Sequence, residues 1–108
     1  MKFLQTILFS GYRQCMSTKR IIFEGRVQKI GFRYATRQIA LGFDVIGWVK
    51  NLEDGSVELV IEGEDDEVTE FIEEITEESN LSHHIKNVIQ EDLPPLENVM
   101  GFTITKPS

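Results

Sequence analysis

The sequence predicts an α+β fold, a split β-α-β-β-α-β arrangement in which two helices cover one face of a mainly antiparallel sheet, with one extra short strand. Three observations predict it. Strand-like and helix-like segments alternate, the pair Asp54-Gly55 joins two apolar runs as a hairpin, and an acidic segment carries an apolar stripe at helical spacing. The 108 residues, 41% of them apolar, suffice for one compact domain.

The first half of the chain predicts a strand, a loop and a helix. Lys19–Gly25 is a short apolar run with a β-branched centre, which is typical of a strand. Arg26–Gly31 follows as a loop bounded by glycines. Phe32–Leu41 places its apolar residues on one helical face, and Gly42 suits the position just past the end of a helix.

The middle of the chain predicts a β-hairpin. Val45–Leu52 and Ser56–Glu62 form its strands, and Glu53–Gly55 forms the tight connection. Trp48 is expected to pack in the core beside the hairpin. Gly63 is expected to end the second strand.

The acidic segment Glu64–Glu78 predicts an amphipathic helix. Its carboxylates form a solvated face, and the glutamates at its end oppose the helix dipole, so we expect the last turn to fray. Its apolar stripe consists of Val68, Phe71, Ile72 and Ile75.

The C-terminal part completes the second half of the fold. Ser79–His83 is expected to be a loop and His84–Asp92 a strand. Leu93–Leu96, which contains two prolines, is expected to be a linker to a last short strand at Gly101–Thr105.

The charge is distributed unevenly along the chain. The formal net charge is −7, which argues against general binding of nucleic acid or of an anionic membrane. However, residues 1–50 hold nine basic and two acidic residues, a charge of +7, whereas residues 51–108 carry −14. The asymmetry suggests an anion site in the first half. The sequence has no apolar run long enough to span a membrane.

The N-terminal segment 1–18 is expected to be a poorly ordered extension of a domain over residues 19–108. It lacks the uninterrupted apolar region and the cleavage site of a signal peptide. Met16 is an alternative natural start. The single cysteine, Cys15, excludes an internal disulfide, is expected to be an inert thiol and fits a cytoplasmic location.

Several kinds of catalytic motif are absent from the sequence. It contains no G-x-S-x-G elbow, no C-x-x-C pair and no H-E-x-x-H motif. His83 and His84 would point to opposite faces of a strand, which is a poor arrangement for binding one metal ion.

The stretch Gly25–Arg33 (GRVQKIGFR) is the segment best suited to bind an anion. A strand, a glycine-bounded loop and a helix start occur in that order, so that loop and helix N–H groups form a cradle. Arg33 lies in the first helical turn, where its guanidinium can bind two phosphate oxygens. From these residues alone, an ordinary strand-to-helix turn with a surface arginine is the slightly favoured interpretation, since a Walker-type GK(S/T) motif is missing.

The chain resembles the acylphosphatase family. The resemblance rests on GRVQKIGFR, then Ala40 and Gly42, then GWVKN and DGSVE, with matching spacing, and it extends from Lys19 to Thr105. It implies a ferredoxin-like α/β sandwich with five strands and two helices. It also implies hydrolysis of the carboxyl-phosphate bond of small acyl phosphates, without a metal or cofactor.

The resemblance also implies the roles of individual residues. Arg33 matches the family's phosphate-binding arginine, and Asn51 matches the asparagine that orients the attacking water. The backbone N–H groups of the loop match its phosphate cradle, which in this chain is formed by Val27, Gln28, Lys29, Ile30, Gly31 and Phe32.

Lys29 is the main departure from the family pattern, since it replaces a glycine, while Ile30 replaces the usual valine. A left-handed backbone there would strain a lysine, whereas any other backbone would let Lys29 add positive charge. Two further hypotheses follow: a non-catalytic module that binds phosphate or a protein, and a domain that handles carbamoyl phosphate. We expect a monomer with a small acyl phosphate as its ligand.

Overall fold

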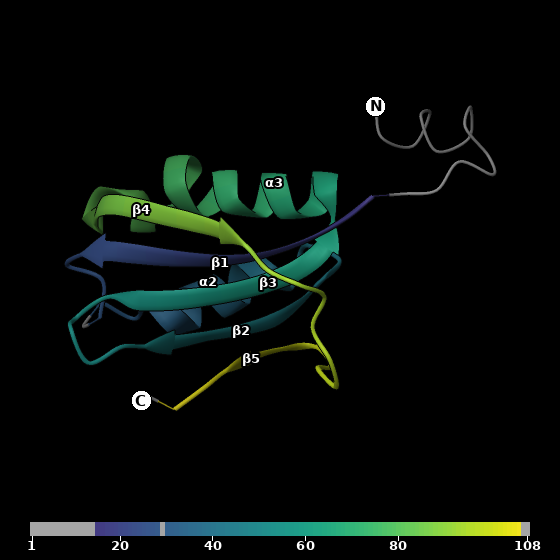
Figure 1. The fold of residues 1–108 in the computed structure, drawn as a ribbon. Coiled ribbons are helices and arrows are strands. Elements are labelled where there is room, and N and C mark those ends of the chain that lie inside the picture. Colours follow the sequence, from purple (N-terminus) through teal and green to yellow (C-terminus); the bar gives the residue numbers. More distant parts are fainter. Residues whose placement is uncertain (1–14, 29, 107–108) are drawn as a thin grey trace.

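The structure is a computed structural model that describes residues 15–28 and 30–106. One five-stranded sheet, in the order β4-β1-β3-β2-β5, forms its centre (Figure 1). All neighbouring strands are antiparallel except β2 and β5, which are parallel. The elements are β1 (Met16–Gly25), α2 (Phe32–Ala40), β2 (Val45–Asn51), β3 (Val57–Glu64), α3 (Asp65–Glu73), a π-helical turn (Glu74–Glu78), a 3-10 helix (Asn80–His84), β4 (Ile85–Asp92) and β5 (Phe102–Ile104). The predicted split β-α-β-β-α-β order with an additional short strand is confirmed.

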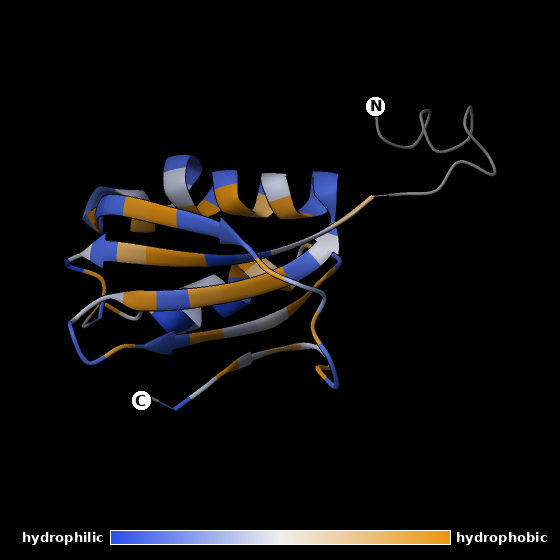
Figure 2. Cartoon of the chain, viewed as in Figure 1, coloured by the Kyte–Doolittle hydropathy of each residue, from blue (hydrophilic) through white to orange (hydrophobic). Residues whose placement is uncertain are grey.

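The two helices cover one face of the sheet. Helix α2 packs against β2 and β5, and α3 packs against β3 and β1. The apolar residues of the strands and of the inner helix surfaces meet between the two layers, as the hydropathy colours show (Figure 2). The largest fully buried side chains of this core are Phe23, Phe32 and Phe71. Among the described residues, no helix is both long enough and apolar enough to cross a bilayer.

β1 begins three residues earlier than predicted, at Met16 rather than Lys19. It is longer because β3 is longer: Met16 pairs with Glu64, and the Thr18 hydroxyl donates a 2.8 Å hydrogen bond to Glu62. The sheet therefore includes the last three residues of the predicted N-terminal extension. Residues 1–14 of that extension lie outside the described part of the chain.

The prediction that Gly63 ends the second hairpin strand is wrong. β3 continues through Gly63, which pairs with Ser17 on one side and with Val45 on the other. A β-carbon at this position would lie 2.9 Å from the carbonyl oxygen of Asp44. The glycine therefore permits a close approach between two chain segments inside the sheet, rather than a break.

The acidic helix keeps its predicted apolar stripe, but its last turn is wide rather than frayed. The chain is α-helical to Glu73 and then forms a π-helical turn in which the N–H of Ser79 donates to the carbonyl of Glu74 at 2.8 Å. The wide turn keeps Ile75 fully buried, and Leu81 in the following 3-10 helix is buried as well. That 3-10 helix replaces the predicted loop and includes His84, so β4 begins at Ile85.

The prediction that Trp48 packs in the core is also wrong. In β2 the residues on the helix side are Val45, Gly47 and Val49, so Trp48 lies on the opposite face and is half-buried. Its indole N–H lies 3.4 Å from a carboxylate oxygen of Glu58.

Charged side chains surround Glu58 on this helix-free face of the sheet. The Arg20 guanidinium lies 2.6 Å from Glu58 and 3.0 Å from Glu91, and Lys50 lies 3.9 Å from Glu58. The hydrogen bonds to Glu58 and then to Glu91 raise the pKa of Arg20 above its usual value. The charged side chains around Glu58 on this face are thus ion-paired with one another.

Candidate active site

Four chain segments meet at one end of the sheet. β1 and β2 end there, and β3 and β4 begin there. The register places Asn51, Val57, Phe23 and Val88 in one row across the strands, because Asn51 pairs with Val57, Val57 with Phe23, and Phe23 with Val88. The loop 26–31 leaves β1 two residues beyond this row and leads into α2. The predicted site residues of the loop, of α2 and of β2 therefore belong to one end of the fold.

Arg33 is the second residue of α2, which begins at this end. Gly31 precedes the helix in the left-handed conformation, with φ of 74°, which explains the need for glycine there. No side chain caps the helix, and its first turn contains no acidic residue. The N–H groups of the first turn of a helix have no partner within the helix, so this N-terminus is suited to bind an anion.

The side chains of Val27 and Phe32 fix the loop to the protein. Both are fully buried, and the rings of Phe32 and Phe23 lie 5.2 Å apart between centroids. Only the backbone of these two residues is therefore suited to a role in a cradle, as predicted. Ile30 is 37% exposed, and Lys29 lies outside the described residues.

Asn51 is the last residue of β2 and lies on the helix-covered face, because it follows Val49 by two residues and Val49 is a core residue. Its side-chain oxygen is buried and makes no hydrogen bond within the described part of the chain. Buried polar atoms almost always have a partner. An unpartnered acceptor at the end of the sheet where α2 begins suits a water molecule that Asn51 would orient.

Gln28 connects the loop to the β2–β3 turn. Its side-chain amide donates to the carbonyl of Leu52 at 2.7 Å and to that of Ser56 at 2.8 Å. Gln28 thereby holds the loop beside the turn that follows Asn51. The sequence predicts only a backbone role for Gln28, and this side-chain role is not apparent from it, since the partners lie 24 and 28 residues further along the chain.

The β2–β3 turn is held by its own hydrogen bonds as well. The carboxylate of Asp54 accepts from the backbone N–H of Ser56 at 3.0 Å and from its hydroxyl at 2.5 Å. The hydrogen bond from the Ser56 hydroxyl, and to a smaller extent the one from its N–H, lowers the pKa of Asp54 below its usual value. The carboxylate of Asp54 is thus engaged within the turn.

Comparisons with known proteins identify the family. The acylphosphatase family model matches residues 19–104. The chain is 37% identical over 83 residues to the acylphosphatase of Bacillus pumilus, a match that covers 77% of this chain and 91% of that protein. The chain belongs to the acylphosphatase family.

Solved structures support the family's fold for this chain. The crystal structure of acylphosphatase from Bacillus subtilis matches with a TM-score of 0.74 and 34% identity, over 84% of this chain and 99% of that one. Full-length HypF, crystallised in its phosphate- and nucleotide-bound form, matches with a TM-score of 0.77 and 27% identity. That match covers 90% of this chain but 13% of HypF, so the likeness is to a small part of a larger protein. The predicted ferredoxin-like sandwich is confirmed.

Two close backbone contacts explain glycines of the acylphosphatase-like motifs. A β-carbon at Gly47 would lie 1.9 Å from the carbonyl oxygen of Val60, and one at Gly25 would lie 2.3 Å from that of His84. Gly47 thus lets β2 and β3 approach each other before Asn51, and Gly25 lets β4 begin beside the loop. Both positions have positive φ, which adds strain for any other residue.

The described residues include no group of three or more histidine, cysteine or acidic side chains placed to hold a metal ion. His83 and His84 are exposed at the end of the 3-10 helix, and Cys15 is an exposed free thiol. The cations of the helix-free face are ion-paired, whereas Arg26 and Arg33 form no ion pair with a described carboxylate.

Proposed function

We propose that the chain hydrolyses small acyl phosphates to a carboxylate and inorganic phosphate. One observation carries the proposal. Arg33 at an uncapped helix start and Asn51, with its buried unpartnered oxygen, lie at the same end and on the same face of the sheet. Phosphoryl transfer to water requires that the water is positioned and that the charge of the phosphate is neutralised. Asn51 is suited to position the water, and Arg33 is suited to neutralise the charge.

In the proposed reaction, Arg33 and the N–H groups of residues 27–32 bind the phosphate oxygens. Their positive charge and dipoles stabilise the negative charge that the transition state spreads over these oxygens. Asn51 accepts a hydrogen bond from the attacking water and holds it in line with the bond that breaks. The water oxygen bonds to phosphorus, the bond from phosphorus to the acyl oxygen breaks, and the water's proton passes to the phosphate product.

The leaving group accounts for the sparse set of site residues. An acyl phosphate releases a carboxylate, which is the conjugate base of an acid with a low pKa. The leaving carboxylate therefore needs little help from a general acid. An arginine, an asparagine and backbone amides suffice for this chemistry without a side-chain nucleophile.

The decisive experiment measures hydrolysis of benzoyl phosphate by the full chain near neutral pH. We expect turnover well above spontaneous hydrolysis, with retained activity despite Lys29 in place of the family's glycine. A correctly folded preparation that releases phosphate no faster than buffer would overturn the proposal. Binding of phosphate by such a preparation would favour a non-catalytic module instead.

A second candidate function is that of a carbamoyl-phosphate-handling domain related to part of a larger enzyme, and the match to 13% of HypF shows that this fold also occurs as a small part of a larger protein. This second function is tested by comparing kcat/KM for carbamoyl phosphate with that for benzoyl phosphate. A strong preference for carbamoyl phosphate would favour the second function. Comparable values would favour a general acyl phosphate hydrolase. We also propose that the protein is a monomer and that it is cytoplasmic, and the single cysteine, which cannot form an internal disulfide, supports the proposed location.

A further inference from the structure

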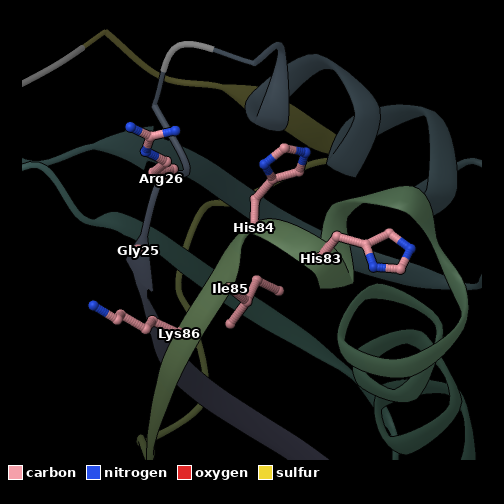
Figure 3. Close-up of a pocket in the computed structure, with 6 residues that line it drawn as sticks. All are labelled: Gly25, Arg26, His83, His84, Ile85 and Lys86. Carbon is pink, nitrogen blue, oxygen red and sulfur yellow. The ribbon is translucent and has the colours of Figure 1, made fainter.

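A second basic pocket lies beside the loop 26–31. It has a volume of about 460 Å³ and is lined by Gly25, Arg26, His83, His84, Ile85 and Lys86 (Figure 3). This volume falls within the range of about 300–1,000 Å³ for small-molecule pockets. Four of the six lining residues carry basic nitrogen atoms, and none is acidic. Such a lining is unexpected in a chain with a net charge of −7, and it favours an anionic ligand.

The two permanent cations of this pocket are free to bind. Arg26 and Lys86 are exposed, and neither forms an ion pair with a carboxylate among residues 15–28 and 30–106. The nearby Glu24 instead accepts a hydrogen bond from Asn87 at 3.0 Å.

The pocket is fixed to the loop by the backbone. The N–H of Arg26 donates to the carbonyl of His84 at 3.0 Å, and Gly25 pairs with Ile85 where β1 and β4 meet. In Figure 3, the side chains of Arg26 and His84 both lie on the side of Gly25 that faces the loop. Arg26 and His84 are thus held at the start of the loop that is suited to bind phosphate, whereas Lys86 extends from β4 on the other side of Gly25 and His83 points away from Arg26 (Figure 3).

The strand order places this pocket across the loop from Asn51. β1, which leads into the loop, lies between β4 on one side and β3 and β2 on the other. Arg26 bonds to the start of β4 on the first side, and Gln28 bonds to the β2–β3 turn on the second. The loop therefore has the pocket on one flank and Asn51 on the other.

The geometry of in-line displacement predicts on which side of the loop the acyl group leaves. The attacking oxygen and the leaving oxygen lie on opposite sides of the phosphorus atom. If Asn51 holds the water, the acyl group leaves on the side away from Asn51, which is the side of the basic pocket. This step rests on the proposed function, because it uses the roles proposed for Asn51 and for the loop.

We propose that this pocket is a specificity site for acyl phosphates whose acyl part carries a second anionic group. Arg26 and Lys86 bind that group by charge-assisted hydrogen bonds, and the imidazole of His84 supplies a further donor. The pocket thereby selects a carboxylate-bearing acyl part over a neutral one of the same size.

The test compares two stable ligands that differ by one carboxylate, benzylphosphonate and 4-carboxybenzylphosphonate. Their dissociation constants are measured by isothermal titration calorimetry with the full chain at low salt. We expect the carboxylated ligand to bind about tenfold more tightly, which is the scale of one charge-assisted hydrogen bond. Lys86→Gln and Arg26→Gln should each reduce this ratio at least about threefold.

Lys19→Gln is the matched control. It removes one positive charge from β1, but Lys19 is ion-paired with Asp92 at 2.7 Å and lies six residues from Gly25 along the strand. We expect it to leave the ratio unchanged, so that a loss in Lys86→Gln reflects the pocket rather than net charge. Equal binding of both ligands, no binding of either, or a ratio that all three variants share with the wild type would overturn the proposal.

Turnover separates this proposal from the proposed function. A chain that hydrolyses benzoyl phosphate but shows no preference for the carboxylated ligand keeps the proposed function and overturns the specificity site. A chain without turnover that still shows the preference, reduced in Lys86→Gln and Arg26→Gln, keeps the pocket and overturns the proposed hydrolysis.

Discussion

The two helices of this fold begin in opposite electrostatic surroundings. α3 starts with Asp65, Asp66 and Glu67, whose carboxylates face the positive end of its own dipole. α2 starts with Phe32 and Arg33, and no acid or side-chain cap satisfies its first turn. The chain therefore neutralises one helix start from within and leaves the other for an anion from outside. The open start is the one that adjoins the loop, Asn51 and the basic pocket.

Removal of Arg33 is the strongest way to break this comparison. We expect Arg33→Ala to lower kcat/KM for benzoyl phosphate about 1,000-fold or more, since it removes the charge that stabilises the transition state. Arg37→Ala is the matched control, one helical turn further on, and should change kcat/KM by less than about threefold. Steady-state kinetics of both variants measure the difference, and equal losses would contradict the role proposed for Arg33.

Asn51→Ala should have the next largest effect. Without the amide, the water is no longer held in line, and we expect kcat to fall about 100-fold while KM changes little. Asn87→Ala, an exposed asparagine on β4, serves as the control. An Asn51→Ala enzyme with normal kcat would show that the water is positioned by another group.

Gln28→Ala tests the connection between the open helix start and the β2–β3 turn. It removes two hydrogen bonds, to the carbonyls of Leu52 and Ser56, so we expect a loss of about 1–3 kcal/mol in the free energy of unfolding. We also expect kcat to fall about tenfold, because the loop and Asn51 lose their common support. Urea denaturation and kinetics measure the two effects. Gln90→Ala on exposed β4 should show neither.

Exchanging the charges of the two helix starts sharpens the comparison. Tyr34 is 63% exposed in the first turn of α2, so Tyr34→Asp would give that helix an acid of its own. We expect phosphate, as a competitive inhibitor, to bind a few-fold more weakly, since a carboxylate would then occupy the field of the helix start. Asp66→Asn removes an acid from α3 and should leave the inhibition constant unchanged. The opposite order of effects would show that the α2 start is no anion site.

The smallest expected effect is a shift in the pKa of Asp54, whose carboxylate accepts hydrogen bonds from Ser56 within the β2–β3 turn. Because its pKa is lowered in the folded protein, the carboxylate form stabilises the turn above the usual pKa of 3.8. This contribution is lost as the pH falls through the lower folded value. NMR titration of the Ser56 amide should therefore report a pKa below that of an unstructured peptide. The Asp54→Asn variant should abolish the titration, and a wild-type midpoint at the peptide value would count against the hydrogen bonds.

Most of the fold follows from local patterns in the sequence. The apolar runs, the Asp54-Gly55 turn and the stripe of the acidic segment suffice for the element order, because each is set by neighbouring residues. Gly63 and Trp48 were misplaced for a different reason. Gly63 lies within a strand, where the missing side chain lets the backbone of Asp44 approach it closely. Trp48 faces away from the helices because side chains alternate between the two faces of β2 and Val49 faces the core. The alternation in β2 could have been predicted from the sequence, but the close approach of Asp44 to Gly63 could not.

The features of the candidate site also fall into those that local sequence indicates and those that depend on contacts between distant segments. Arg33, the loop and Asn51 could be named as candidates because they belong to short motifs that resemble those of the acylphosphatase family. The side-chain role of Gln28 and the basic pocket could not, since both depend on which strands become neighbours. The pocket in particular exists because β4 begins beside the end of β1, although about 60 residues separate them in the chain.

The central position of β1 has a consequence for how the chain folds. β1 is synthesised before the other four strands, yet its partners β3 and β4 are complete only at Glu64 and Asp92. At synthesis rates of about 5–20 residues per second, both edges of β1 wait for seconds before they are paired. Pairing over such sequence separations is slow compared with helix formation. We therefore expect the loop and its two flanks to become functional only late in folding, after β4 has paired with β1.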